Sequence, residues 1–272
     1  MTSAAYIGCD AMDRIAIANR GLNYGDGLFE TMRIHRGDVP LWPRHLVRLR
    51  DGAKRLGIAM PDVAFVETRI ADMARGCDAG VLKLLLTRGD GGRGYAPSAA
   101  ARPVWMLALH PMPSSHSTVC LHWCELRLAP QPALAGIKHC NRLEQVLARM
   151  EVECAGCDEG LLLDLDGNVV SATAANLLVQ QQGRWVTPPV DRCGVAGVLR
   201  GWLLEQGLAD VRAMSREDVA SAPALALCNA VRGILPVVAL DGRECAPDPA
   251  RDELQGRLAM AYPMFSTTAG GA

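Results

Sequence analysis

The sequence predicts an α+β protein made of two domains. Its 272 residues exceed one average domain, and half of them are hydrophobic while about a fifth are charged, so the chain can bury a substantial core. Strand-like apolar runs are interleaved with segments of helical periodicity. The segment 111–117 is rich in proline and serine and separates two strand-like runs. We therefore predict domains over 1–110 and 118–272, joined by this linker.

The first domain mixes short strands with two helices. Leu46, Leu49 and Ala53 recur at helical spacing and Gly57 follows them, which predicts a helix over 43–56. The other predicted elements are strands at 4–8, 14–18, 28–35, 80–87 and 103–110, a helix at 62–75, and loops at 19–27 and 88–95.

The second domain contains more strands and begins with a strand followed by a helix. The helix is predicted over 142–155, where Asn141 and Glu144 resemble a capping box. Its apolar residues at helical spacing, on one face, are Leu143, Val146, Leu147, Met150 and Cys154. Asp166-Gly167 predicts a hairpin turn. Further strands are predicted at 118–127, 160–164, 168–173, 176–180, 184–187, 211–213 and 224–229, with a helix at 195–206, a hairpin at 234–244 and a terminal helix.

Charge and composition exclude several classes of function. The formal net charge of -1 argues against a basic surface for nucleic acid or anionic lipid. The N-terminus has no signal-peptide pattern and no apolar run reaches bilayer-spanning length, so we expect a cytoplasmic protein that does not bind membranes.

The ten cysteines are scattered among apolar residues, as expected of reduced, buried thiols. Cys154-x-x-Cys157 is a single pair, and Cys120, His122 and Cys124 alternate along a predicted strand. No second pair completes a tetrahedral site, so we expect no metal.

Lysine is scarce, and its scarcity directs attention to individual positions. The chain has only Lys54, Lys83 and Lys138, and its other basic residues are arginines. Lysine, unlike arginine, can lose its proton and form a Schiff base. Lys138 precedes a predicted helix and is either an exposed loop residue or a nucleophile entering a cleft. Lys83, in an apolar strand, either lies at an edge or pairs with an anion, whereas Lys54 is expected on the surface.

Two glycine-containing segments are candidates for phosphate binding. Residues 193–200 begin a helix after Pro188-Pro189, where free backbone N–H groups favour an anion, although an ordinary helix start has the same appearance. The loop between Gly89 and Gly94 fits neither dinucleotide-binding nor P-loop spacing. We interpret it as a mobile loop that carries Arg88 and Arg93 beside a site.

Several motifs together resemble a known enzyme family. The segments 19–31, His45-x-x-Arg48-Leu49, 88–95, 136–147 and Ala175-Asn176-Leu177 closely resemble the aminodeoxychorismate lyases. These belong to the fold-type IV pyridoxal-phosphate enzymes, with branched-chain and D-amino-acid aminotransferases. The resemblance spans nearly the whole chain, and 136–147 is its most specific part. It implies a smaller N-terminal α/β domain, a larger C-terminal domain with a mixed, barrel-like sheet and helices, and a homodimer.

The resemblance also implies roles for individual residues. Lys138 would be the Schiff-base lysine, and Arg48 with the backbone amides of Val198 and Leu199 would hold the phosphate of pyridoxal 5'-phosphate. The full set implied to contact this cofactor is Arg48, Lys138, Ser171, Ala174, Gly197, Val198, Leu199 and Ala230. The residues implied to contact substrate are Tyr24, Lys83, Arg88 and Arg93.

The implied reaction converts 4-amino-4-deoxychorismate, a dicarboxylate, to 4-aminobenzoate and pyruvate, a step in folate precursor synthesis. One position departs from the family, because Ser171 stands where a glutamate usually pairs with the pyridine nitrogen. A hydroxyl cannot supply the charge that raises the pKa of that nitrogen, so the electron sink is expected to be weaker. Transamination depends more on a protonated pyridine, so Ser171 favours a lyase over the alternative, an aminotransferase for D- or branched-chain amino acids. A third alternative is a pyridoxal-phosphate-binding protein without catalysis.

Overall fold

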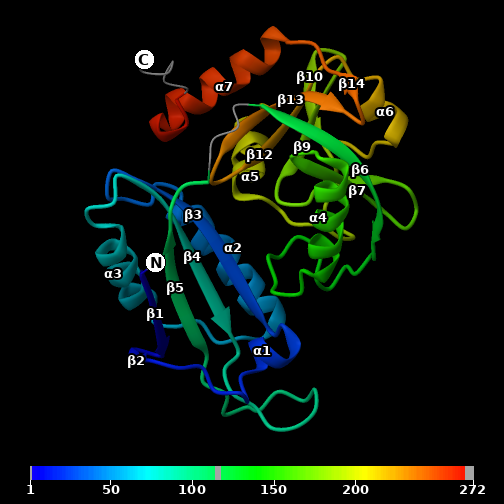
Figure 1. The fold of residues 1–272 in the computed structure, drawn as a ribbon. Helices are drawn as coiled ribbons and strands as arrows, with labels where there is room; N and C mark the ends of the chain where they lie inside the picture. The colour runs from blue at the N-terminus through cyan, green and yellow to red at the C-terminus, as the bar shows by residue number, and fades with distance from the viewer. Residues whose placement is uncertain (1, 114–117, 267–272) are drawn as a thin grey trace. The chain divides into compact units, whose positions relative to one another are not determined.

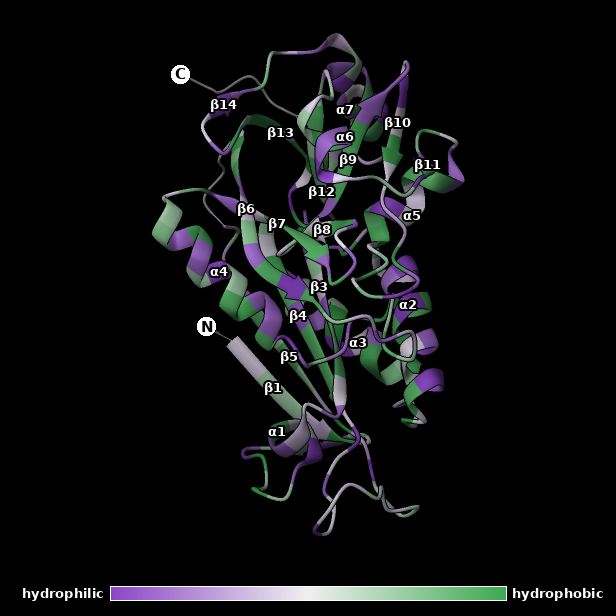
Figure 2. Ribbon diagram, turned by 90° about the vertical axis from the view of Figure 1, so that its right-hand side faces the viewer, coloured by the Kyte–Doolittle hydropathy of each residue, from purple (hydrophilic) through white to green (hydrophobic). Residues whose placement is uncertain are grey.

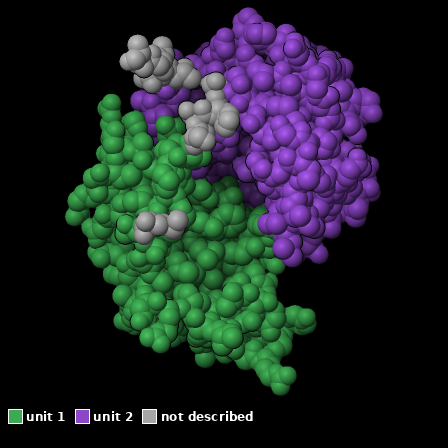
Figure 3. All heavy atoms as spheres, in the orientation of Figure 1, with its two compact units in different colours: residues 1–113, 137–142 green, residues 114–136, 143–272 purple. Residues whose placement is uncertain are grey.

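The computed structural model describes residues 2–113 and 118–266 and divides into two compact units (Figure 1). Unit 1 comprises Met1–Pro113 and Ile137–Arg142, and unit 2 comprises Ser114–Gly136 and Leu143–Ala272 (Figure 3). The segment Ile137–Arg142 thus packs with unit 1, although the sequence places it inside the predicted C-terminal domain. Residues 114–117 of the predicted linker 111–117 lie outside the described residues.

Unit 1 is built on an antiparallel sheet of five strands in the order β2-β1-β5-β4-β3. Side chains of β3 alternate between a buried and a partly exposed face, and Leu28, Met32 and Ile34 lie on the buried one. Helix α2 packs on this face, where its Gly52 lies against Leu28. The strands are β1 (Thr2–Ile7), β2 (Asp10–Met12), β3 (Gly27–His35), β4 (Ala79–Thr87) and β5 (Val104–His110), and the helices are α1 (Arg20–Tyr24), α2 (Trp42–Leu56) and α3 (Val63–Ala74).

Most elements predicted for this unit are confirmed, but two expectations near the N-terminus are wrong. The chain at 14–18 is irregular, and the second strand is the earlier β2. Ile17 is 86% exposed, so this segment has no core to face. The predicted loop at 19–27 contains α1, whose first turn is capped by Asn19, because its side chain accepts a hydrogen bond from the Gly21 N–H.

Unit 2 contains a mixed sheet of nine strands, curled into a half-barrel. Its main path runs β11-β10-β9-β12-β13-β6-β7-β8, and β14 pairs with β13. Strand β6 runs parallel to both of its neighbours, β7 and β13. The strands are rich in hydrophobic residues (Figure 2), and residues of α4 cover one part of the sheet while residues of α5 and α7 cover another part.

The elements predicted for unit 2 are confirmed with shifted ends, and the short helices α6 and η1 were not predicted. The strands are β6 (Val119–Leu128), β7 (Glu159–Asp164), β8 (Val169–Ala172), β9 (Asn176–Gln181), β10 (Arg184–Thr187), β11 (Asp210–Val211), β12 (Leu225–Asn229), β13 (Gly233–Leu240) and β14 (Arg243–Glu244). The helices are α4 (Leu143–Ala155), α5 (Val198–Glu205), α6 (Arg216–Ala220), α7 (Pro249–Ala261) and the 3-10 helix η1 (Pro263–Phe265).

Helix α4 exposes its larger apolar side chains. Its core contacts come instead from the small residues Ala148 and Val152, which are fully buried. The exposed apolar side chains are Leu143 at 77%, Val146 at 53%, Leu147 at 52% and Met150 at 60%. We call these four residues the α4 apolar face.

The capping box predicted for this helix is wrong. The Asn141 side chain donates a hydrogen bond to the Gly25 carbonyl at 3.2 Å. The Glu144 carboxylate accepts one from the Ala129 N–H at 3.0 Å. Both side chains therefore tie the region before the helix to other parts of their own units.

Segment Ile137–Arg142 pairs with the edge strand β3 of unit 1. The Phe29 N–H donates to the Lys138 carbonyl at 3.0 Å, and the Cys140 N–H donates to the Gly27 carbonyl at 2.9 Å. The bond from Asn141 to Gly25 extends this pairing. These contacts fix the backbone of Lys138 relative to β3.

Replacing Gly25 by alanine should test that attachment. Gly25 and Gly57 both end helices with left-handed φ angles, of 64° and 63°, so alanine costs each about 1–2 kcal/mol of backbone strain. A Cβ at Gly25 would also lie 2.6 Å from the Asn141 side-chain oxygen, whereas one at Gly57 meets nothing within 4 Å. In urea unfolding, Gly25→Ala should lose about 1–3 kcal/mol more than Gly57→Ala. Equal losses would contradict the role given to the Asn141 contact.

Candidate active site

Lys138 holds its amine over an aromatic ring in unit 1. Its Nζ lies 4.2 Å from the centre of the Phe29 ring, and the Nζ of Lys83 lies 5.4 Å from the same centre. The hydrogen bond from the Phe29 N–H to the Lys138 carbonyl explains this position, because it holds the two residues side by side at the edge of the sheet. Among the described residues, the structure gives the Lys138 amine no carboxylate as an ion-pair partner.

The surroundings of this amine favour its neutral form. Burial lowers the pKa of Lys138 to about 7, and the positive charges of Arg48, Arg142 and Lys83 act in the same direction. The carboxylate of Glu30 opposes them only in part. At neutral pH a large share of the molecules therefore carry an amine with a free electron pair, which a nucleophile or base requires.

Glu30 is a buried carboxylate that joins β3 to α2. It accepts hydrogen bonds from the Nε of Arg48 at 2.9 Å and from an Nη of the same guanidinium, and it lies 2.6 Å from Nδ1 of His45. Burial alone would raise the pKa of Glu30, but Arg48 and His45 outweigh it and hold the pKa at about 2. Glu30 thereby orients Arg48, the residue that the family resemblance assigns to the cofactor phosphate.

The predicted substrate residues of unit 1 fall into two groups. Lys83 and Arg93 are exposed, and Tyr24 is partly exposed with its ring 5.5 Å from that of Tyr95. Arg88 is instead held by an ion pair with Asp26 at 2.7 Å.

Arg88 also donates to two backbone carbonyls at the end of α2, those of Leu56 and Gly57. Arg20, which also pairs with Asp26, donates to the carbonyls of Gly94 and Tyr95. Two arginines and one aspartate thus anchor the glycine-rich loop to the rest of unit 1.

In unit 2, the start of α5 has the features of an anion site. Gly197 is the N-cap and makes no side-chain cap, so the amides of Val198 and Leu199 have no partner within the helix. A Cβ on Gly197 would lie 2.0 Å from the Asn176 side-chain oxygen, so only glycine fits. Asn176 is itself fixed, because its amide donates to the Val195 carbonyl at 2.9 Å.

Ser171, Ala174 and Ala230 lie on or directly after strands β8 and β12 of unit 2. Ser171 is buried on β8, opposite Leu162 of β7. Ala174 is in the turn after β8, where its carbonyl accepts a hydrogen bond from Asn229 at 3.4 Å. Ala230 directly follows Asn229 and is buried. The turn and the end of β12 are therefore linked by a hydrogen bond.

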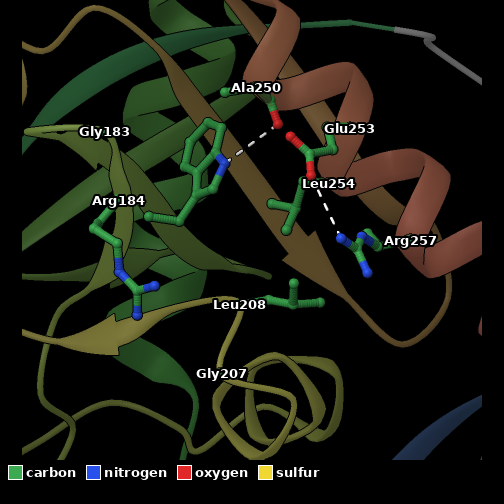
Figure 4. A pocket seen from close by; sticks show the side chains of 9 residues that line it. Gly183, Arg184, Gly207, Leu208, Ala250, Glu253, Leu254 and Arg257 are labelled. Atoms are coloured by element: carbon green, nitrogen blue, oxygen red, sulfur yellow. Dashed lines mark hydrogen bonds and ion pairs between the residues drawn. The ribbon is translucent and has the colours of Figure 1, made fainter.

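A surface hollow elsewhere in unit 2 contains none of the predicted site residues (Figure 4). It lies between Trp185, Leu208 and Leu254, and Glu253 pairs with Arg257 at 3.7 Å at its border. Within residues 2–113 and 118–266, no group of three or more histidine, cysteine or acidic side chains is arranged to hold a metal ion. In the same residues, no helix combines the length and the apolar character that a membrane span needs.

Comparison with known proteins identifies the family. The model of the class IV aminotransferases matches residues 27–240, most of the chain. The chain belongs to the class IV aminotransferase family. The fold is accordingly that of the fold-type IV enzymes, whose cofactor is pyridoxal phosphate.

The similar proteins include lyases and aminotransferases. Aminodeoxychorismate lyase of Vibrio harveyi is 32% identical, over 90% of this chain and 94% of its own. The structure of 4-amino-4-deoxychorismate lyase from Pseudomonas aeruginosa is 41% identical, with a TM-score of 0.88 over 95% of this chain and 99% of its own. D-alanine aminotransferase of Bacillus licheniformis is 25% identical over 90% of each chain.

Sequence reasoning missed the supporting residues of the site. Glu30, His45 and Asn176 lie within the motifs that carry the family resemblance, but the sequence predicted no role for any of them. Glu30 could have been noticed in the sequence. It is an acidic residue that shares the core-facing side of a predicted strand with Leu28, Met32 and Ile34, where a charge needs a partner. Asn176 had no such signal, since its contact with Gly197 joins residues that are distant in the sequence.

The low pKa of Lys138 predicts unusual reactivity at neutral pH. In cofactor-free protein, trinitrobenzenesulfonate should label the Lys138 peptide with a half-maximal rate near pH 7, because the reagent attacks only neutral amines. The exposed Lys54, quantified in the same digests by mass spectrometry, reports the reaction of a solvated lysine. Coincident pH profiles for the two peptides would mean that burial and the arginines do not act on Lys138.

Proposed function

We propose that this chain is a pyridoxal-phosphate-dependent lyase that converts 4-amino-4-deoxychorismate to 4-aminobenzoate and pyruvate. The observation that carries the proposal is the amine of Lys138, which has a pKa of about 7 and no carboxylate partner among the described residues. Similarity to the two proteins named as lyases of this substrate supports the choice of reaction. The product is a precursor of folate.

The cofactor suits residues of both units. Lys138 supplies the amine that attaches its aldehyde carbon, and the Arg48 guanidinium, oriented by Glu30, supplies charge for its phosphate. The resemblance also assigns to the phosphate the amides of Val198 and Leu199 in unit 2, which have no partner within helix α5. The remaining assigned contacts are those of Ser171, Ala174, Gly197 and Ala230.

In the proposed reaction, Lys138 acts as attachment point and then as base. When bound, pyridoxal phosphate withdraws electrons from the amine-bearing carbon of the substrate. The amine of Lys138, once released, accepts the proton from that carbon. The ether bond to the enolpyruvyl group then breaks, the ring becomes aromatic and pyruvate leaves after protonation. A pKa near 7 suits this work, because the amine accepts and returns a proton near neutral pH.

The proposed substrate carries two carboxylates, which require positive partners. Lys83 lies on the same face of the sheet as Phe29, because it stands opposite Thr31 in the register of β3 and β4. The Lys83 and Lys138 amines therefore lie close to the same Phe29 ring. We assign Lys83, Arg93 and Tyr24 to substrate binding, and assign Arg88 to anchoring the loop that carries Arg93.

We further propose a homodimer that works in the cytoplasm. The α4 apolar face is a contiguous exposed patch of the kind that partner subunits cover, and the ten unbridged thiols fit a reducing compartment. Leu147→Glu should shift the sedimentation of the protein toward the monomer. Leu165→Glu, at an exposed leucine in a turn, should leave the dimer intact. A monomeric unmodified protein would contradict this arrangement.

An aminotransferase is the second candidate, favoured by the similarity to D-alanine aminotransferase. Ser171 argues against it. The side chain is buried and neutral, so it supplies no negative charge to favour a protonated pyridine nitrogen, on which transamination depends more than an elimination does.

The direct test of the proposed function is an assay of the purified protein loaded with pyridoxal phosphate. Incubation with 4-amino-4-deoxychorismate should release 4-aminobenzoate and pyruvate in equal amounts. Lys138→Ala should reduce turnover by about 1,000-fold or more, whereas Lys54→Ala should leave it unchanged. Release of neither product, together with faster amino transfer from D-alanine or branched-chain amino acids, would establish the aminotransferase instead.

Restoring a carboxylate at Ser171 should change the balance between the two reactions. Ser171→Glu places a negative charge where the resemblance puts the pyridine nitrogen and should raise its pKa. The ratio of half-transamination of simple amino acids to 4-aminobenzoate formation should then increase. The pH dependence of the cofactor absorbance should shift in the same variant. If both stay unchanged, Ser171 does not control the choice of reaction.

A further inference from the structure

Two cysteines in unit 2 lie unusually close together. The Sγ atoms of Cys120 and Cys157 are 2.9 Å apart, closer than two sulfur atoms in ordinary van der Waals contact. Cys120 is on β6, and Cys157 is in the turn between α4 and β7. One cysteine comes from the group of Cys120, His122 and Cys124, and the other from the pair Cys154-x-x-Cys157. The proposed function gives neither motif a role.

The backbone around this pair holds the two positions in place. The Cys120 N–H donates to the Asp158 carboxylate at 2.8 Å, and the Asp158 N–H donates to the Cys120 carbonyl at 3.1 Å. The parallel pairing of β6 with β7 begins at the next residues, Leu121 and Glu159. The proximity of the sulfurs therefore follows from the sheet and does not depend on a flexible loop.

We propose that Cys120 and Cys157 form a reversible disulfide bond. One thiolate of the pair attacks a small-molecule disulfide and releases one small thiol. The other cysteine then attacks the mixed disulfide and releases the second small thiol. Overall, the two protein sulfurs lose two electrons and two protons, and the small-molecule disulfide gains both and becomes two thiols.

Among the described residues, the only other contact of these sulfurs is a long one, from the Cys120 thiol to the Leu121 carbonyl at 4.0 Å, and the other cysteines and the histidine nearby have partners elsewhere or lie on the surface. The thiol of Cys124 is buried and donates to the Ala148 carbonyl, and His122 pairs with Asp241. Cys154, at the end of α4, is exposed. Its separation from Cys157 by two residues resembles a redox motif, but the short sulfur contact is made by Cys120 instead.

The charges around the pair determine how fast it reacts. Burial raises the pKa of Cys120 to about 12, and Cys157, Asp158 and Asp241 act in the same direction. Exchange proceeds through a thiolate, so oxidation should be slow near neutral pH and should accelerate as the pH rises. The bond would close a loop from β6 to β7 that contains Lys138 and α4.

The bond can be detected in the intact enzyme. After incubation with oxidised glutathione at pH 8.5, a non-reducing digest should contain one peptide pair that links Cys120 to Cys157. Thiol titration in urea should find two fewer thiols than the ten of the sequence. Cys154→Ser, three residues away, should still form the link, whereas Cys157→Ser should not. A link to Cys154, glutathione adducts alone or ten free thiols would overturn the proposal.

The equilibrium constant gives a second test that does not depend on rate. The fold that holds the sulfurs together should favour the bond, as native disulfides do, so the constant in glutathione buffers should be about 30-fold or more larger for the folded protein than in urea. Reduction with dithiothreitol should restore both thiols. An equal or smaller equilibrium constant for the folded protein would mean that the fold does not favour the disulfide bond.

Discussion

The backbone pairing between β3 and residues 137–142 is the interaction on which the proposed chemistry depends. Two main-chain hydrogen bonds, at Phe29 and Cys140, attach this segment to the edge of the unit 1 sheet. They place the Lys138 amine over the Phe29 ring and within reach of the charges of Arg48 and Arg142. Burial and like charge then lower its pKa to about 7. A lysine on the protein surface lacks both effects, so the fold itself favours the neutral amine that the proposed chemistry needs.

The buried carboxylate of Glu30 partly balances the positive charges of Arg48, Arg142 and Lys83 around Lys138. It binds Arg48 through two nitrogen atoms and contacts His45, which keeps the arginine in place and limits the electrostatic cost of burying it. Its charge also prevents the pKa of Lys138 from falling further. Unit 1 therefore remains suited to anionic ligands. The residues of unit 2 that we assign to the cofactor carry no charge, since they are the amides at the start of α5 and the hydroxyl of Ser171.

Much of the fold could be predicted because periodic burial repeats along the chain. Strand β3 alternates Leu28, Met32 and Ile34 toward α2, and α2 repeats its apolar residues on one side. The predicted strand at 14–18 is wrong, because Ile17 faces solvent instead of the core and its carbonyl accepts a hydrogen bond from the Asn23 side chain. At the candidate site, the scarcity of lysine directed attention to Lys138, whereas the contacts of Glu30 and Asn176 join segments that are distant in the sequence. The same holds for Arg88, whose ion pair with Asp26 is not visible in a local pattern.

Covalent attachment of the cofactor to Lys138 is the central claim, and it is tested most directly by chemical trapping. Borohydride treatment of the protein loaded with pyridoxal phosphate reduces the carbon–nitrogen double bond between the lysine and the cofactor and makes the attachment permanent. Mass spectrometry of the digested protein should then find the pyridoxyl group on the peptide that contains Lys138. A label on Lys83 or Lys54, or no label on any lysine, would contradict the assignment.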